Sequence, residues 1–436
     1  MPLEVVDLRS DAAASEVLTR HHGGWDRPDL AKAAATVRRI LGDVREDGDE
    51  AVLSYTASFD GVELDPDGLR VSVAERDEAA SRIDERTMKA LHAAADALRE
   101  YHEAQRPQDW SLDRDGASVG QVFRPIRRVG LYAPGGRGAY PSTVLHTAVP
   151  ATVAGVPEIV LCTPPDPSGS PADVILAAAQ VAGITEIYRI GGAQAVGALA
   201  YGTATVRAVD KICGPGNIYV TLAKREVFGT VGIDGLFGPS EAVVVTDAQA
   251  RASFAAAELL TQAEHDPEAA AVLVTTSEEL LAEILRELWD RLRRLPRAAA
   301  IREALANHGL AVLVRDLEQA AEVVDELAPE HLCIHTSEPQ AFLDRVHAAG
   351  TVLVGADTPA TLSDYCAGPS HVLPTARTAR FSSGLSVRDF LVALNTVSYS
   401  RQALFRDASI AETIAETEGL QAHREDLHVR LEEGPG

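Results

Sequence analysis

The sequence predicts an α/β protein built on parallel β-sheet; two observations point to this class, and a third predicts more than one domain. Short apolar runs recur along the chain, and most are followed by a turn and a segment with helical periodicity. Residues 154–161 resemble residues 182–189, one strand–helix unit further on, and repeated units of this kind form parallel sheets with right-handed crossovers. The length of 436 residues exceeds what one core usually supports, so two or more domains are expected.

The composition is globular with a strong acidic excess. Hydrophobic residues make up 46% and charged residues 24%, and the formal net charge is −24. This charge argues against nucleic acid or an anionic membrane as a partner, and no stretch approaches the roughly 18 apolar residues of a spanning helix. The N-terminal residues lack the features of a signal peptide, and the four cysteines show no paired spacing. A cytoplasmic protein without disulfides is expected.

The first part of the chain is predicted to contain one short strand and several helices. Residues 1–25 are interpreted as an N-terminal arm with a short strand and a polar turn. Residues 30–58 have apolar side chains at helical spacing, residues 69–73 alternate like a strand, and residues 75–105 are predicted as one long helix. Residues 107–120 are polar and are predicted to form a loop.

A nucleotide-binding domain is predicted at about residues 130–238. Three strands in this region run into glycine-rich turns, at residues 133–138, 191–192 and 214–216, and each turn opens a helix. Such turns offer backbone N–H groups to phosphate and line the carboxyl edge of a parallel sheet. Gln194 and Asn217 stand at helix entrances, where they either bond a cofactor or cap the helix. The dinucleotide fingerprint with three spaced glycines is absent.

A second sheet and a helical tail complete the prediction. Apolar runs alternate with helical patterns at residues 242–245, 271–274, 311–314, 332–335 and 351–354. After Val397 the chain is helical and rich in Ala and Glu. This tail is too thin to fold alone, so it is expected to pack on the body or on a partner subunit.

Two groups of side chains are candidates for chemistry. Gln262 and His265 are three apart at a helix end, and with Asp364 and His423 they offer donors that zinc accepts. Spacing alone does not establish a metal site, since each His could be structural. Glu330 and His331 follow a proline between a helix and a strand; they suit a water-activating carboxylate and a general base. The alternative is a surface Glu beside a half-buried His.

The order of the longer motifs resembles one family along nearly the whole chain, the histidinol dehydrogenases. The motifs are Val129-Gly130-Leu131-Tyr132, Gly191-Gly192-Ala193-Gln194, Gly214-Pro215-Gly216-Asn217, Gly238-Pro239-Ser240-Glu241, Gln262-Ala263-Glu264-His265-Asp266-Pro267, Ala328-Pro329-Glu330-His331-Leu332, Ser363-Asp364-Tyr365, His371-Val372-Leu373-Pro374 and Glu418-Gly419-Leu420 with His423. With the strand pattern, the resemblance implies two incomplete Rossmann-like domains in an intertwined homodimer. The expected parts are an arm (1–25), a substrate and zinc domain (26–129 with 239–384), an NAD-binding domain (130–238) and a helical tail (385–436).

The resemblance also implies an activity and residue roles. The activity is the zinc-dependent, four-electron oxidation of L-histidinol to L-histidine through L-histidinaldehyde with two NAD, which ends histidine biosynthesis. The implied catalytic pair is Glu330 and His331. The other implied roles are zinc ligation by Gln262, His265, Asp364 and His423, substrate contact by these four together with Ser240, Glu330, His371 and Glu418, and NAD contact by Tyr132, Gln194 and Asn217. The tail would cross to the partner, so Glu418 and His423 would complete the neighbour's site.

Three residues depart from the usual family pattern, and two other functions compete. His146 stands where Met or another apolar residue is common, Phe237 replaces a small residue before Gly238, and Ser370 replaces an Asn before His371. The first competitor is a related zinc- and NAD-dependent dehydrogenase for another small alcohol, such as a sulfonated diol. The second is a metal hydrolase or a binding protein on the same scaffold. The presence of His371 and Glu418 favours histidinol.

Overall fold

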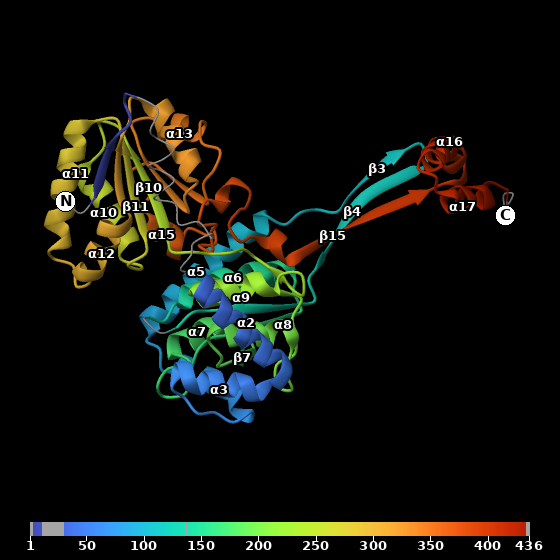
Figure 1. Cartoon of the computed structure of the whole chain (residues 1–436), viewed down its shortest axis with the longest axis horizontal. Helices are drawn as coiled ribbons and strands as arrows, with labels where there is room; N and C mark the ends of the chain where they lie inside the picture. Colours follow the sequence, from blue (N-terminus) through green and yellow to red (C-terminus); the bar gives the residue numbers. More distant parts are fainter. Residues whose placement is uncertain (1–2, 11–29, 136–137, 433–436) are drawn as a thin grey trace. The chain divides into compact units, whose positions relative to one another are not determined.

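The computed structural model describes residues 3–10, 30–135 and 138–432 of the chain (Figure 1). Two compact units are present: Met1–Gln105 with Ile126–Phe390, and Arg106–Pro125 with Leu391–Gly436. Residues 11–25 of the expected arm and residues 136–137 of the first glycine-rich turn lie outside the described residues. Among the helices that are described, none has the length and apolar character needed to cross a membrane.

One six-stranded sheet, sheet A, contains most of the C-terminal half of the first unit, and all of its strand pairs are parallel. Its spatial order is β1 (Glu4–Asp7), β12 (Gly309–Leu313), β11 (Ala270–Thr275), β10 (Glu241–Thr246), β13 (His331–His335) and β14 (Thr351–Val354). The four inner strands are almost entirely buried and mostly apolar on both faces, as parallel strands covered by helices require. One face packs on α10 (Ala252–Ala263), α11 (Glu278–Leu292) and α12 (Ala298–His308), and the other on α13 (Leu317–Leu327) and α14 (Pro339–Leu343).

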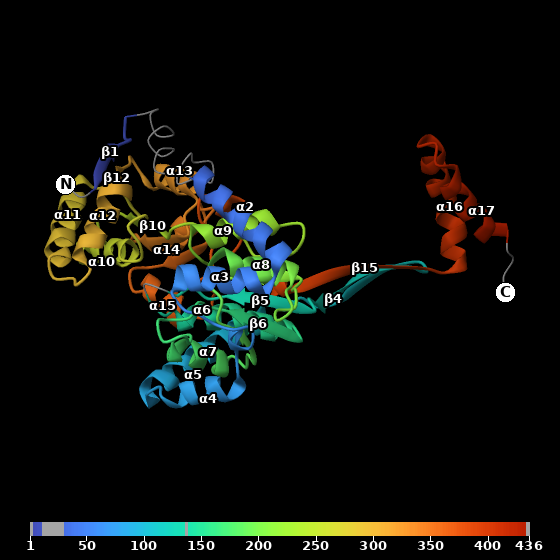
Figure 2. The same ribbon diagram turned by 60° about the horizontal axis from the view of Figure 1, so that its bottom comes forward.

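The second six-stranded sheet, sheet B, has the same pattern of strand order; two of its strands, β5 and β6, are labelled in Figure 2. Its order is β2 (Arg70–Val71), β7 (Glu186–Tyr188), β6 (Glu158–Cys162), β5 (Arg128–Tyr132), β8 (Lys211–Cys213) and β9 (Gly232–Ile233), and only β2 is antiparallel to its neighbour. The helices after its strands are α6 (Pro141–Ala154), α7 (Asp173–Val181), α8 (Gly192–Tyr201) and α9 (Ile218–Val227). In sheet A, β10, β11 and β12 follow one another outward, and β13 then returns to lie beside β10. In sheet B, β5, β6 and β7 do the same, and β8 returns to lie beside β5. The direction of winding therefore reverses between β5 and β8, and between β10 and β13, and ligands favour the carboxyl side of such points.

The expected grouping of residues 26–129 with residues 239–384 is corrected by the packing. Helices α2 (Leu30–Asp47) and α3 (Asp49–Asp60) pack on the sheet B core, and α4 (Val73–Ser81) and α5 (Glu85–Ala104) pack on α7 and α6. An apolar helix stripe predicts that a helix is covered, but not which sheet covers it. The single helix expected at residues 75–105 is two helices, because the Asp84 side chain accepts the Thr87 N–H and caps α5.

The second unit is a three-stranded antiparallel sheet with two helices. Strand β4 (Ala117–Pro125) pairs with β3 (Trp110–Arg114) and with β15 (Leu391–Tyr399), and α16 (Arg401–Thr417) and α17 (Gln421–Glu432) follow. The prediction of a loop at residues 107–120 was therefore wrong, and the tail is not helical at residues 391–399. Residues of β3 and β15 are almost all exposed, so no buried face marks these strands in the sequence.

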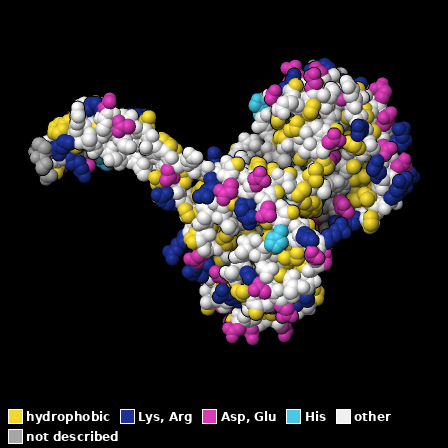
Figure 3. All heavy atoms as spheres, turned by 180° about the vertical axis from the view of Figure 1, so that it is seen from behind, with side chains coloured by type: hydrophobic (Ala, Val, Ile, Leu, Met, Phe, Trp, Pro, Cys, Tyr) yellow, Lys and Arg dark blue, Asp and Glu magenta, His cyan; other side chains and the backbone are white. Residues whose placement is uncertain are grey.

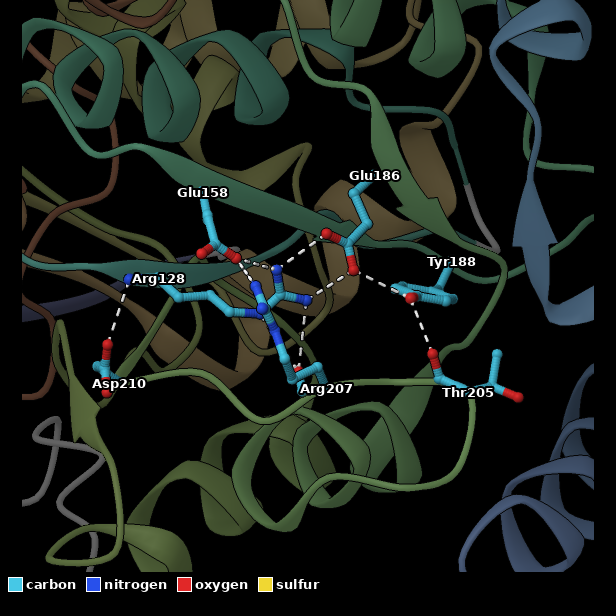
Figure 4. Close-up of polar contacts among 7 residues, drawn as sticks. All are labelled: Arg128, Glu158, Glu186, Tyr188, Thr205, Arg207 and Asp210. Atoms are coloured by element: carbon cyan, nitrogen blue, oxygen red, sulfur yellow. Dashed lines mark hydrogen bonds and ion pairs between the residues drawn. The ribbon is translucent and has the colours of Figure 1, made fainter.

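The amino ends of three sheet B strands are joined by one buried arginine. Arg128 is 4% exposed, and its guanidinium donates to Glu158 at 2.9 Å and to both oxygens of Glu186 at 2.9 and 2.6 Å (Figure 4). Its backbone N–H donates to Asp210, and Arg207 reaches the same Glu158 from outside. Because Arg128, Glu158 and Glu186 each begin a strand, this ionic cluster clamps three parallel strands in register.

Candidate active site

The candidate catalytic residues gather at the amino edge of sheet A. Glu330 and His331 lie where β13 begins, and Ser240 directly precedes β10. Gln262 and His265 lie at the end of α10, which returns over the sheet antiparallel to its strands and so ends at the same edge. Asp364 lies near the end of α15 (Ala360–Tyr365). Residues from four distant parts of the sequence are thus brought to one edge.

His331 lies between two carboxylates. Its Nε2 is 3.2 Å from Oδ1 of Asp364, and its Nδ1 is 3.7 Å from Oε2 of Glu330. The ring is 5% exposed, and burial alone would lower its pKa, but the two carboxylates outweigh burial and raise the pKa to about 10. Glu330 is 8% exposed and is fixed by the Glu241 backbone N–H, which donates to its Oε2 at 2.9 Å. The imidazole is therefore oriented and electrostatically coupled on both sides.

Asp364 is the point where the surrounding histidines converge. Burial would raise the pKa of its carboxyl, but the hydrogen bond with His331 and the charges of His331, His371 and His265 lower it. Gln262 is 3% exposed, and its amide Nε2 has no hydrogen-bond partner within the described part of the chain. Among the described residues, no three His, Cys, Asp or Glu side chains form a metal-binding group by themselves.

His371 is held by two of the residues that depart from the family pattern. The His146 ring stacks on it at 3.9 Å between centroids and 9° between planes, and Nδ1 of His146 accepts the His371 backbone N–H at 2.9 Å. Burial and the neighbouring His371 hold the pKa of His146 well below its usual value, so this ring stays neutral. Ser370 donates its hydroxyl to the His146 carbonyl at 3.0 Å. His146 and Ser370 therefore form one support for His371.

Phe237, the third departure, is accommodated by a buried ion pair. Its ring lies 4.5 Å from Nζ of Lys224, which forms a salt bridge with Asp234 in which both side chains are 1% exposed. The Asp234 carboxylate also accepts the Gly214 N–H at 2.6 Å. The next residue, Gly238, donates its N–H to Thr375. Phe237 thus links the loop before Ser240 to the turn that opens α9.

The three implied NAD residues lie at the carboxyl edge of sheet B. Tyr132 ends β5, is buried, and accepts the Gly192 N–H on its hydroxyl at 3.0 Å. Asn217 caps α9 by accepting the Tyr219 and Val220 N–H groups. Gln194 caps nothing: it is 1% exposed, and neither amide atom has a partner among the described residues. These amide atoms are therefore free for a ligand.

The geometry of this edge also suits a cofactor that approaches the backbone. Gly214 has φ 118°, and a Cβ there would lie 2.2 Å from the Tyr132 carbonyl oxygen. Only glycine fits the turn between β8 and α9, at the reversal point of the sheet. The hydroxyl oxygen of Thr143, in the first turn of α6, lies 3.4 Å from Nε2 of His371. The carboxyl edge of sheet B therefore adjoins His371.

Glu418 and His423 belong to the second unit. Glu418 is the C-cap residue of α16, His423 lies in α17, and both are exposed. The other implied ligands and substrate contacts belong to the first unit.

Two carboxyl groups near the site were missed from the sequence. Glu241 lies beside Glu330, and burial together with the Glu330 charge raises its pKa to about 8. Glu258 is 7% exposed, burial raises its pKa, and it interacts with both His331 and Asp364. Glu258 stands one helical turn before Gln262, so the i, i+4 spacing on α10 was a signal for it.

The residues of the first unit suit the groups that the sequence implies. The Asp364 carboxylate, on which the charge of His265 acts, the His265 imidazole and the side-chain carbonyl oxygen of Gln262 are nitrogen and oxygen donors of the kinds that zinc accepts. The orphaned Gln194 amide and the Gly214 turn suit a dinucleotide.

Comparison with known proteins agrees along most of the chain. The histidinol dehydrogenase family model matches residues 26–431. The histidinol dehydrogenase of Geobacillus kaustophilus is 48% identical, covering 91% of this chain and 93% of the relative, and that of Synechococcus sp. is 46% identical, covering 91% and 92%. The crystal structure of histidinol dehydrogenase from Elizabethkingia anophelis superposes with a TM-score of 0.93 at 33% identity, over 99% of this chain and 98% of that one. The chain belongs to the histidinol dehydrogenase family.

Proposed function

We propose that this protein oxidises L-histidinol to L-histidine through L-histidinaldehyde, in two NAD-dependent steps at one site. The observation that carries the proposal is the array of Glu330, His331 and Asp364 at the amino edge of sheet A. The array contains an oriented imidazole for proton transfer and a second carboxylate for water activation. Family membership supports the choice of substrate.

His331 acts as the general base in both oxidation steps. It takes the hydroxyl proton of the alcohol, and later of the hydrated aldehyde, as hydride is transferred; such help is typically worth about 10²–10⁴-fold in rate. In the described arrangement both carboxylates favour the protonated ring. A ligand that occupies Asp364 removes one of these interactions, which lowers the pKa of His331 toward the range where it accepts a proton.

Glu330 activates the water that hydrates the aldehyde. Its Oε2 is already held by the Glu241 N–H, which leaves Oε1 to orient a water molecule. The neighbouring Glu241, with a pKa of about 8, is neutral at pH 7 and does not repel the Glu330 carboxylate. A buried carboxylate next to an uncharged carboxyl is suited to this role.

Zinc would be held by Gln262, His265 and Asp364, with His423 as the fourth ligand, and it would supply orientation of the imidazole and amine of histidinol. Ser240, His371 and Glu418 would complete the substrate contacts. The convergence of His265 on Asp364 supports this set. Tyr132, Gln194 and Asn217 would bind NAD at the carboxyl edge of sheet B.

We further propose a homodimer in which Glu418 and His423 complete the partner's site. The second unit exposes large apolar side chains on its strands and helices, including Trp110, Val397, Phe405, Ile410 and Ile414, each more than half exposed. Apolar side chains are visible among charged ones on the face in Figure 3. So many exposed large apolar side chains in one small unit favour an interaction surface.

Mixing two inactive variants tests the shared site. His331→Ala and His423→Ala are each expected to be inactive. If each site takes His331 from one subunit and His423 from the other, random re-association restores about a quarter of the wild-type activity, because half of the dimers have one intact site of two. Both variants alone, refolded separately, are the control. No recovery after proven subunit exchange would place both residues in one chain.

The activity itself is tested by the stoichiometry of NADH formed per histidinol consumed. Two NADH with histidine as the product are expected, and one NADH with released aldehyde would sink the two-step reaction. Glu330→Gln should slow aldehyde oxidation more than alcohol oxidation, since only the former needs water. A chelator should abolish turnover, and activity on a sulfonated diol instead of histidinol would favour the related dehydrogenase.

A further inference from the structure

A cavity of about 240 Å³ lies at the carboxyl edge of sheet A, at the other end of the strands from Glu330 and His331. Its lining includes His335, the last residue of β13, and residues that follow β10, β13 and β14, namely Gln249, Arg251, Thr336, Ser337 and Asp357. Strand β13 begins with His331 and ends with His335, so the two histidines are roughly 13 Å apart along the strand. The cavity is therefore separate from the candidate catalytic site.

The topology marks this place as a ligand position. Sheet A reverses its winding between β10 and β13, and the cavity opens where these two strands end. Sheet B reverses in the same way between β5 and β8, where the Gly214 turn and Tyr132 lie. Open parallel sheets bind ligands at such reversal points. The two sheets of the first unit thus have equivalent positions, and only that of sheet B has a use in the proposed reaction.

Unpartnered polar atoms are buried around the cavity. His335 is 2% exposed, and neither of its ring nitrogens has a hydrogen-bond partner among residues 3–10, 30–135 and 138–432. The hydroxyls of Thr336 and of Thr246, the last residue of β10, are also unpartnered there. Buried polar groups are nearly always paired, since leaving one unpaired costs free energy. A ligand in this cavity would supply the missing partners.

The surrounding groups favour an anion. Helix α10 points its amino end at this edge, its N-cap residue Arg251 makes no side-chain cap bond, and its first turn contains no acidic residue. The Arg251 guanidinium stacks on Phe254 at 4.9 Å and adds positive charge. The nearby Asp247 carboxylate is occupied by Ser337 and by the Gln249 N–H. Asp357 is exposed on the rim, where it suits a hydroxyl of the same ligand.

We propose that this cavity is a second binding site, for a small oxyanion of the phosphate type. The anion takes hydrogen bonds from the amino end of α10, from Arg251 and from the Thr336 hydroxyl. His335 is neutral when the cavity holds no anion, because burial lowers its pKa, and it donates one ring N–H. Inorganic phosphate and the phosphate of a phosphomonoester share this chemistry, and Asp357 distinguishes them by binding a hydroxyl of the latter.

The test is a titration of ¹³C-histidine-labelled protein with inorganic phosphate, followed by NMR at constant ionic strength. The His335 ring signal is identified by its loss in His335→Asn. A saturable shift of this signal is expected, and Arg251→Gln should weaken binding about tenfold by removing a charge-assisted hydrogen bond. Arg302→Gln, which changes an exposed arginine on α12, is the matched control and should bind as the wild type does.

Four outcomes decide the proposal. Absence of a saturable His335 shift overturns it, and so does a shift that is unchanged in Arg251→Gln while that variant keeps its circular dichroism spectrum. Tighter binding of ribose 5-phosphate than of phosphate, with the gain lost in Asp357→Asn, supports the site and assigns a phosphomonoester. Equal binding of both supports the site and assigns free phosphate.

Discussion

Replacement of Arg128 by Met should destabilise the first unit more than any other single arginine replacement at the amino edge of sheet B. The Arg128 side chain is 5% exposed and is shared by Glu158 and Glu186, whose side chains are 30% and 23% exposed (Figure 4). A methionine side chain fills most of the space of the arginine's aliphatic part but provides no hydrogen-bond donor. Two carboxylates at the starts of β6 and β7 would then lose their main partner.

The expected cost follows from burial. Removing one partner of a buried ion pair costs about 3–5 kcal/mol. Because about a quarter of each carboxylate side chain still reaches water, the lower end, about 3 kcal/mol, applies here. Arg207 bonds the same Glu158, but its side chain is 60% exposed, so Arg207→Met should cost at most about 1 kcal/mol. Arg207→Met is therefore the matched control.

The assay is urea unfolding followed by circular dichroism, at several pH values. Burial would raise the pKa of Glu186, but its bonds with Arg128 and Tyr188 lower it overall. Because the pKa of Glu186 is lower in the folded state than the unfolded value of 4.5, ionised Glu186 stabilises the folded protein at pH values above 4.5. This stabilisation is lost as the pH falls through the folded-state pKa. The difference in free energy of unfolding between wild type and Arg128→Met should thus be largest at pH 7 and should become smaller below about pH 4.5. Equal costs for the Arg128 and Arg207 variants, or a gap that widens in acid, would refute the reasoning.

Three further predictions concern other buried groups. Lys224→Met should cost about 3–5 kcal/mol in thermal or urea unfolding, because it leaves the Asp234 carboxylate buried and unpaired; a loss below 1 kcal/mol would contradict this. His146→Ala should raise KM for histidinol more than it lowers kcat, since it removes the acceptor and stacking partner of His371; an unchanged KM would count against that support role. Iodoacetamide should label Cys366 alone in the native protein, because the other three thiols are buried, and mass spectrometry of the digested protein checks this.

Much of the fold could be predicted from local patterns. Most strands of both sheets and the glycine-rich turns of sheet B were recognisable, because a parallel strand is a short apolar run and a tight turn needs glycine. The two-residue strand β9 was missed. The sheet covered by residues 30–104 could not be predicted, because an apolar stripe fits any apolar face. The strands β3, β4 and β15 were missed or misassigned, because β3 and β15 have almost no buried residues and β4 few.

The candidate site divides in the same way. The sequence by itself determined the residue types, the Gln262–His265 helical spacing, the adjacent Glu330 and His331, and, through the order of its motifs, the family. Only the tertiary structure decided that His331 lies between Glu330 and Asp364, that His146 supports His371, and that Glu241 and Glu258 lie beside them. The physical reason is distance: these contacts join residues that are far apart in sequence, and their burial and pKa values depend on what surrounds them after folding.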